Sequence, residues 1–170
     1  MELNLEEALE APVDVSYRVE VPMGRLERPE LLELQPVAFT GILQKADPGF
    51  VLTGRFSVSG EIACSRCLAP VTFSSSGDVS WLFAPTHRRP SEEETELTTS
   101  DLDVVWYDEF IVPFDPLVEE QLLLELPMKP LCRPDCLGLC PRCGADRNSV
   151  PCDCREEVDE RLAKLKSLLA

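Results

Sequence analysis

Residues 36–67 contain the main signal for the fold, in the sequence PVAFTGILQKADPGFVLTGRFSVSGEIACSRC. Apolar and polar side chains alternate over Val37–Leu43 and again over Phe50–Ser59, which is the pattern of strands with one buried face. The tripeptide DPG at 47–49 is a turn signal between them. The segment therefore predicts two strands joined by a turn, and it ends on two cysteines.

Further strand patterns lie on both sides of this stretch. Residues 13–21 alternate strictly, with four valines and a tyrosine on one face and polar side chains on the other. Additional short strands are predicted at Glu61–Cys64, Val71–Phe73, Asp78–Phe83 and Val104–Tyr107. Short strands with close turns predict a mainly antiparallel β body, either a sheet or a partly open barrel.

Helices are predicted mainly toward the C-terminus. The stretch DPLVEEQLLLELP predicts a helix near 116–126, with Asp115 as its N-cap and Pro116 at its first position. A second helix is predicted over 158–170, and a short one near the N-terminus is capped by Asn4. The expected fold class is α+β.

The expected organisation has three parts. A β-rich body covers residues 1–128, a Cys-rich metal-binding module covers 129–157, and the C-terminal helix covers 158–170. A chain of 170 residues that is 44% hydrophobic can bury one core with a small appendage. The stretch THRRPSEEETELTTSD, residues 86–101, has no apolar periodicity and predicts a loop.

The sequence predicts a cytoplasmic protein without a membrane partner. No run approaches the roughly 18 apolar residues of a membrane span. The N-terminus, MELNLEEALE, is acidic, whereas a signal peptide begins with basic residues. In the reducing cytosol, clustered cysteines more often hold a metal or do redox work than form disulfides.

The charge is strongly acidic and unevenly spread. The net charge is -15; residues 1–128 carry 8 basic and 24 acidic side chains, whereas residues 129–170 carry 8 and 7. Such an acidic body repels phosphate backbones, which argues against broad, charge-driven binding of nucleic acid. A local arginine cluster could still dock on RNA.

Six of the eight cysteines lie in LCRPDCLGLCPRCGADRNSVPCDC, residues 131–154. Cys140 and Cys143, followed by Gly144, form a C-x-x-C turn in which two thiolates point the same way, which is typical of structural zinc. One or both of Cys152 and Cys154 are the next ligands expected. We expect one zinc held by four cysteines, and the candidate ligands are Cys132, Cys136, Cys140, Cys143, Cys152 and Cys154.

The number of cysteines leaves the ligand set open. Six thiolates exceed one tetrahedral site and fall short of two, so either two are spare or Cys64 and Cys67 complete a second site. An iron–sulfur cluster is the weaker alternative, because the usual C-x2-C-x2-C run is missing. Arginines spaced through the module either offset the thiolate charge or contact RNA: Arg133, Arg142, Arg147 and Arg155.

The pair Cys64 and Cys67 lies between predicted strands. Pro70 and more β-forming residues follow it, unlike a thioredoxin-like site, where the pair opens a helix. The pair is therefore two buried small residues, half of a metal site, or a turn that presents Arg66. The single histidine, His87, has no catalytic motif around it, and we predict that the protein is not an enzyme.

Several of these segments together resemble one known family. The similar segments are, in chain order, Cys64-Ser-Arg-Cys67-Leu68, DPLVEEQLLLELPMKPLCRPDCLGLCPRCGADRN, CDC and DERLAKL. Over residues 55–166 the chain resembles the YceD family, the large ribosomal RNA subunit accumulation proteins. The resemblance implies a non-enzymatic factor needed for large-subunit rRNA to accumulate. It also implies that some members lack the later six cysteines, so that the metal stabilises the C-terminal segment.

The sequence and the resemblance together predict a factor for assembly of the large ribosomal subunit. The expected partners are precursor rRNA of the large subunit, one of its ribosomal proteins, or both, and no small-molecule substrate is expected. The candidate contacts are Arg66, Arg133, Arg142 and Arg147, because guanidinium groups match phosphates and stack on bases. The alternative is an adaptor or chaperone for a basic ribosomal protein that does not touch RNA.

Overall fold

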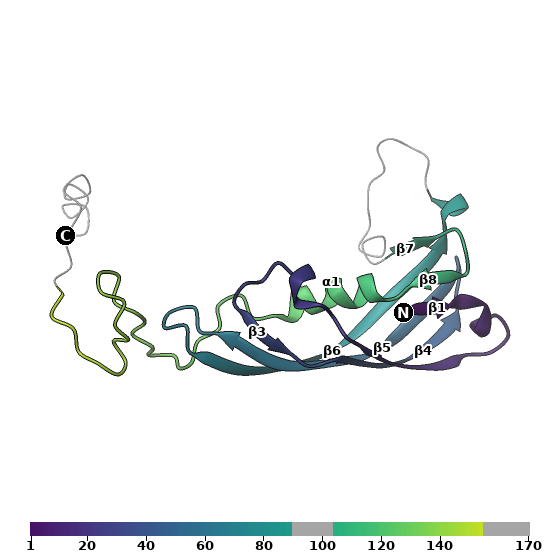
Figure 1. Cartoon of the computed structure of the whole chain (residues 1–170). Helices are drawn as coiled ribbons and strands as arrows, with labels where there is room; N and C mark the ends of the chain where they lie inside the picture. Colours follow the sequence, from purple (N-terminus) through teal and green to yellow (C-terminus); the bar gives the residue numbers. More distant parts are fainter. Residues whose placement is uncertain (90–103, 155–170) are drawn as a thin grey trace, which may run out of the picture.

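The computed structural model describes residues 1–89 and 104–154. In these residues eight strands, three short 3-10 helices and one α-helix follow one another (Figure 1). In chain order they are β1 (Glu2–Asn4), η1 (Leu5–Ala8), β2 (Val13–Val19), η2 (Met23–Arg25), β3 (Leu31–Leu34), β4 (Val37–Lys45), β5 (Phe50–Ala63), β6 (Pro70–Pro85), η3 (Thr86–Arg88), β7 (Val104–Tyr107), β8 (Ile111–Pro113) and α1 (Asp115–Glu125).

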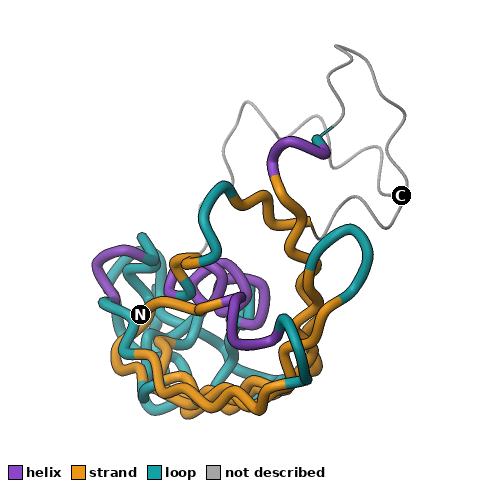
Figure 2. Tube along the Cα trace, turned by 90° about the vertical axis from the view of Figure 1, so that its right-hand side faces the viewer, coloured by secondary structure: helices purple, strands orange, loops and turns teal. Residues whose placement is uncertain are grey.

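Six strands form one open sheet in the order β2-β4-β5-β6-β7, with β3 also paired to β5. All of its neighbours are antiparallel except β6 and β7, which are parallel. Strands β1 and β8 form a separate antiparallel pair. The sheet curves around α1, which lies on one of its faces (Figures 1 and 2). The predicted α+β class with a mainly antiparallel sheet is confirmed, and the sheet is open rather than a barrel.

Strands β5 and β6 are longer than the sequence predicts, with 14 and 16 residues. The separate strands predicted at 71–73 and 78–83 are parts of β6, and residues 61–63 are the end of β5. The register runs without a break from Phe50 opposite Phe83 to Ala63 opposite Pro70. Because this pairing is continuous, β6 extends through the serine-rich residues 74–77, where the composition alone suggests a break in the strand.

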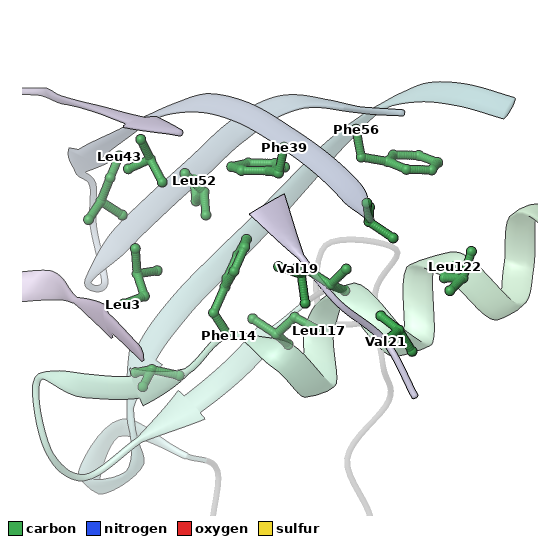
Figure 3. Packing of buried hydrophobic residues seen from close by; sticks show 14 of the residues in the cluster. Leu3, Val19, Val21, Phe39, Leu43, Leu52, Phe56, Phe114, Leu117 and Leu122 are labelled. Atoms are coloured by element: carbon green, nitrogen blue, oxygen red, sulfur yellow. The ribbon is translucent and has the colours of Figure 1, made fainter. Parts of the chain in front are cut away.

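The core lies between the sheet and α1, and aromatic rings form its centre (Figure 3). Phe39 and Phe114 are fully buried, and their ring centroids lie 5.3 Å apart. Gly41 and Gly54 face each other across β4 and β5 beneath the Phe39 ring. A Cβ atom on Gly54 would lie 2.6 Å from Cζ of Phe39, so the missing side chains make room for this ring.

Helix α1 starts differently from the prediction. Asp115 is its first residue, and the N-cap is Phe114, which makes no side-chain capping bond. The Asp115 carboxylate instead accepts a hydrogen bond of 2.6 Å from the amino group of Met1. The Asp115 carboxylate, which the sequence predicts as the cap of the helix, is therefore engaged in a tertiary contact. By contrast, Asn4 caps its short helix as predicted, accepting from the Glu6 amide at 3.0 Å.

The predictions for the helix over 158–170, for Arg155 and for most of the loop over 86–101 fall outside the described residues. Among the residues that are described, no helix has the length and apolar character needed to cross a membrane. The division of the chain at 128/129 stays a prediction.

The chain leaves α1 along the sheet toward the tip of the β5–β6 hairpin. Glu125 accepts a hydrogen bond of 2.6 Å from Ser75 of β6, and the Pro127 carbonyl accepts one from Arg28. The Pro130 carbonyl then accepts a hydrogen bond from the Ser65 amide at the hairpin tip. Figure 1 shows that residues 130–154 continue beyond this tip, at the opposite end of the molecule from β8. These contacts place the tail against the C-x-x-C turn of Cys64 and Cys67 at the hairpin tip.

Candidate metal centres

The eight cysteines form two groups of four, and either group could hold a metal ion. The proximal site consists of Cys64, Cys67, Cys132 and Cys136, and the distal site consists of Cys140, Cys143, Cys152 and Cys154. In each group all sulfur atoms lie within 4.8 Å of one another. The sequence left open whether Cys64 and Cys67 complete a second site, and this grouping favours two sites over the expected single one. The physical reason is that the hairpin tip, distant in sequence, supplies the two thiols that the six later cysteines lack.

The proximal site joins the hairpin tip to the first part of the tail. Cys64 directly follows β5, and both it and Cys136 are buried. Their sulfur atoms are 3.9 Å apart, and those of Cys67 and Cys132 are 3.6 Å apart. The Cys132 amide also donates to the Cys64 sulfur at 3.4 Å. Of the three alternatives for Cys64 and Cys67, this geometry favours the one in which they form half of a metal site.

The two C-x-x-C turns have the same backbone geometry. The amide of Leu68 donates to the Cys64 carbonyl at 3.0 Å, and the amide of Gly144 donates to the Cys140 carbonyl at 2.9 Å. Leu68 and Gly144 both have positive φ, 62° and 73°. The distal turn uses glycine at this position, where the conformation costs no Cβ strain, whereas the proximal turn tolerates a leucine. Each turn leaves its two sulfur atoms on one side.

The sulfur spacing fits a tetrahedral ion. Zinc–sulfur bonds of about 2.3 Å give a tetrahedron whose edges are about 3.8 Å. The two sulfur–sulfur distances of 3.6 and 3.9 Å in the proximal site match this value. All eight cysteines are free thiols, and these separations far exceed the roughly 2.05 Å of a disulfide bond. The groups are therefore suited to coordination and are not disulfides.

Local hydrogen bonds favour the thiolate form of one cysteine of the proximal site, Cys64. Burial acts to raise the pKa of Cys64, but backbone amides of Cys67 and Arg66 oppose it and hold the pKa at about 6. Burial, together with the neighbouring thiols, raises the pKa of Cys132 to about 12. Burial also acts to raise the pKa of Cys136, yet the Asn148 side chain helps to leave it lowered. Some thiols of the proximal site therefore keep protons that a bound cation would displace.

The distal site has the same division. Backbone amides of Cys143 and Arg142 lower the pKa of Cys140 to about 6. Hydrogen bonds to Cys143 and Cys140 raise the pKa of Cys154 to about 12. In both sites the first cysteine of the C-x-x-C turn therefore has a lowered pKa. A divalent ion that binds there would meet a thiolate before the remaining thiols lose their protons.

All four arginines predicted as contacts are exposed: Arg66 and Arg142 lie within the two C-x-x-C turns, and Arg133 and Arg147 lie elsewhere on the tail. Arg66 donates from Nη1 to the Cys136 carbonyl at 2.7 Å. Arg133 donates to the Asn148 side chain at 2.8 Å and lies 3.6 Å from the Asp135 carboxylate. These contacts of Arg66 and Arg133 are made to oxygen atoms, not to sulfur. Contact of Arg66, Arg133, Arg142 and Arg147 with RNA stays a prediction.

Asn148 was not among the site residues predicted from the sequence. Its side-chain amide donates to the Cys136 sulfur at 3.4 Å, so it supports a thiol of the proximal site. No ligand spacing marks an asparagine 12 residues beyond a cysteine, because the contact depends on how the loop folds back. The shared Cys-x-Arg-Cys pattern of the two turns was the one signal for two related sites.

The fold and the cysteine groups define an α+β protein with an open sheet and two candidate metal centres. Residues 52–169 match the family model described as "Large ribosomal RNA subunit accumulation protein YceD". The chain belongs to the YceD family, as the resemblance over 55–166 predicted.

The relatives are bacterial and plant proteins. An uncharacterized protein of Mycobacterium tuberculosis is 35% identical over 75% of this chain and 59% of its own length. The uncharacterized protein YlbN of Bacillus subtilis is 31% identical over 67% of this chain and 64% of its own length. A maize protein named "Large ribosomal RNA subunit accumulation protein YCED homolog 1, chloroplastic" is 26% identical, over 63% and 44%. This chain thus spans 59% of the length of the mycobacterial relative. A search of solved structures found no significant match.

Proposed function

We propose that this protein is a non-enzymatic, cytoplasmic factor that supports accumulation of large-subunit rRNA during ribosome assembly. Membership of the YceD family is the observation that carries this proposal. The family name describes a process, the accumulation of large-subunit rRNA, and the family model matches residues 52–169 of this chain. Its conspicuous chemical groups are two sets of thiols suited to holding metal, which is consistent with a binding role.

The proposed metal is zinc, with one structural ion in each site. Zinc in structural sites prefers four thiolates in a closed tetrahedron, and the sulfur distances of 3.6 and 3.9 Å agree with that geometry. The proximal ion would hold the tail against the hairpin tip, and the distal ion would close the loop between Cys143 and Cys152. The role of both ions is to shape a surface, and no reaction step is assigned to them.

The proposed contact surface lies at the hairpin tip and on the adjoining tail. Arg66 is exposed at that tip, and its bond to the Cys136 carbonyl orients it. Arg147 is exposed on the tail. Since the body is acidic, with the net charge of the whole chain at -15, RNA would approach most favourably at this arginine-bearing end. The same acidity supports the alternative partner, a basic ribosomal protein held by the body.

The test is ultraviolet crosslinking in cells, followed by fractionation of the lysate on a density gradient and sequencing of bound RNA. We expect crosslinks on large-subunit precursor rRNA, reduced severalfold by Arg66→Ala combined with Arg147→Ala. Arg55→Ala is the matched control, because Arg55 is exposed on the sheet and pairs with Asp78 at 2.9 Å, away from the tip. Protein that stays at the top of the gradient without crosslinks would contradict RNA contact and favour the adaptor alternative.

A further inference from the structure

Asn148 lies between the two ligand pairs of the distal site, yet its side chain contacts the proximal site. Its Nδ2 atom donates to the Cys136 sulfur at 3.4 Å. Its Oδ1 atom accepts from the Leu137 amide and from Arg133, both at 2.8 Å. One asparagine side chain therefore touches the sulfur, the backbone and a charged side chain of the segment that carries Cys136.

The loop around Asn148 is tightly held within the distal site. The Asp146 carboxylate accepts from the Asn148 amide at 3.0 Å and from the Asn148 side chain at 2.6 Å. It also accepts from the Ser149 hydroxyl at 2.9 Å. At the start of the loop, the Ala145 carbonyl accepts from the Cys140 amide at 2.8 Å. An ion that fixes both ligand pairs of the distal site would therefore fix both ends of this loop.

A second set of contacts joins the two sites through the backbone. The Arg66 carbonyl accepts from the Leu139 amide at 2.9 Å, and the Gly138 carbonyl accepts from the Arg147 amide at 3.0 Å. Gly138 has a φ of +72°, and a Cβ atom there would lie 2.9 Å from the Arg66 carbonyl oxygen. The segment between the sites thus bonds to both the proximal turn and the distal loop, and it packs so closely on the proximal turn that position 138 has no room for a side chain.

We propose that Asn148 is a positioning residue of the proximal site and that it couples the two sites, so that metal in the distal site increases metal affinity at the proximal site. This inference rests on the proposed metal binding by both groups. A hydrogen bond donated to a thiolate ligand stabilises its negative charge. The bond is available only while the loop is in place, and the distal ion holds the loop. By linkage, the proximal ion increases affinity at the distal site by the same factor.

The test uses the full chain loaded with zinc. Zinc is withdrawn with a chelator, and short pulses of N-ethylmaleimide with mass spectrometry report the release of each cysteine pair separately. Cys152→Ser with Cys154→Ser removes the distal site while leaving Asn148 in place. We expect it to speed the labelling of Cys64 and Cys136 about tenfold, the usual size of a lost outer-shell contact.

Asn148→Ala is expected to speed proximal labelling by a similar factor, and to add little when combined with the distal-site variant. Val150→Ala is the matched control, because Val150 lies in the same loop and is 56% exposed, so the change should leave proximal labelling unchanged. If the wild-type chain holds zinc in both sites, proximal labelling in the distal-site variant within twofold of wild type would overturn the coupling alone. Absence of zinc protection at both sites of the wild-type chain would overturn the proposed metal role as well.

Discussion

At the scale of single residues, glycine and cysteine determine where segments of the molecule pack closely. Gly41 and Gly54 lie opposite each other so that Phe39 can cover both. The side chains of Cys64 and Cys136 are buried, although they lie 72 residues apart in sequence. In both cases a small group allows a close contact that a larger one would prevent.

Gly54→Ala is expected to destabilise the fold by about 1–3 kcal/mol, because its Cβ would lie in backbone and ring atoms of a packed core. The nearest would be the Thr40 carbonyl oxygen at 2.5 Å and Cζ of Phe39 at 2.6 Å. Urea denaturation followed by tryptophan fluorescence measures the change. Gly24→Ala is the control, since no atom lies within 4 Å of the added Cβ. Equal stabilities of the two variants would contradict the packing argument.

The thiols predict a pH dependence of metal retention. Cys64 and Cys140 have pKa values of about 6 in the folded protein, against an ordinary 9.0. A lowered pKa stabilises the folded state fully above the ordinary value, and the contribution is lost as pH falls through 6. Because a bound ion lowers these pKa values further, we expect zinc release with a midpoint below about pH 6.

Absorbance of a zinc-sensitive dye across about pH 4 to 8 measures this release. Full retention of zinc at about pH 4 would contradict thiolate ligation. Release that begins well above neutral pH would contradict the lowered pKa values of Cys64 and Cys140.

At the scale of elements, the junction of β8 and α1 holds the helix on the sheet. Phe114 is fully buried, and its ring lies 5.0 to 5.8 Å from those of Tyr17, Phe39 and Trp81. Aromatic rings at such distances prefer tilted or edge-on contacts, as they have here. The helix start is therefore set by packing and not by a capping side chain.

Phe114→Ala is expected to lower the free energy of unfolding by about 3–5 kcal/mol, the usual cost of deleting a buried ring. Ile111→Ala in β8 is the control, because Ile111 is 53% exposed, and we expect it to change stability by under about 1 kcal/mol. Chemical denaturation of both variants compares them. A loss for Phe114→Ala no larger than that of the control would show that the helix is held elsewhere.

At the scale of the whole molecule, the body and the tail depend on different interactions. The hydrophobic core cluster draws on residues from Leu3 to Leu126. In the described tail, 131–154, the buried hydrophobic residues are Cys136 and Cys140. So small an apolar contribution does not order 24 residues by itself. The tail therefore depends on hydrogen bonds and on the proposed ions.

Removal of zinc by a chelator is expected to release the tail while the sheet stays folded. Limited proteolysis with mass spectrometry should show new cleavage within 131–154, together with unchanged circular dichroism from the strands. Cys67→Ser with Cys132→Ser should increase cleavage without chelator. Identical cleavage patterns with and without metal would contradict the dependence of the tail on ions.

The prediction from sequence was accurate where the signal is local. Alternation at 13–21 and 37–43 identified β2 and β4, and Val104–Tyr107 was predicted with its bounds. It failed where a partner decides the outcome: β6 is one strand because β5 pairs with its full length. The Asp115 carboxylate was likewise assigned locally, but Met1 takes it.

The fold class, the family and the cysteines as candidate ligands follow from the sequence, because periodicity, C-x-x-C spacing and motif order are properties of neighbouring residues. The division of the eight thiols into two groups depends on tertiary contacts. Cys64 and Cys67 meet Cys132 and Cys136 because α1 directs the chain back along the sheet to the hairpin tip. The same return places Asn148 against Cys136. Such pairings depend on where packing brings distant segments together, and no spacing in the sequence encodes that.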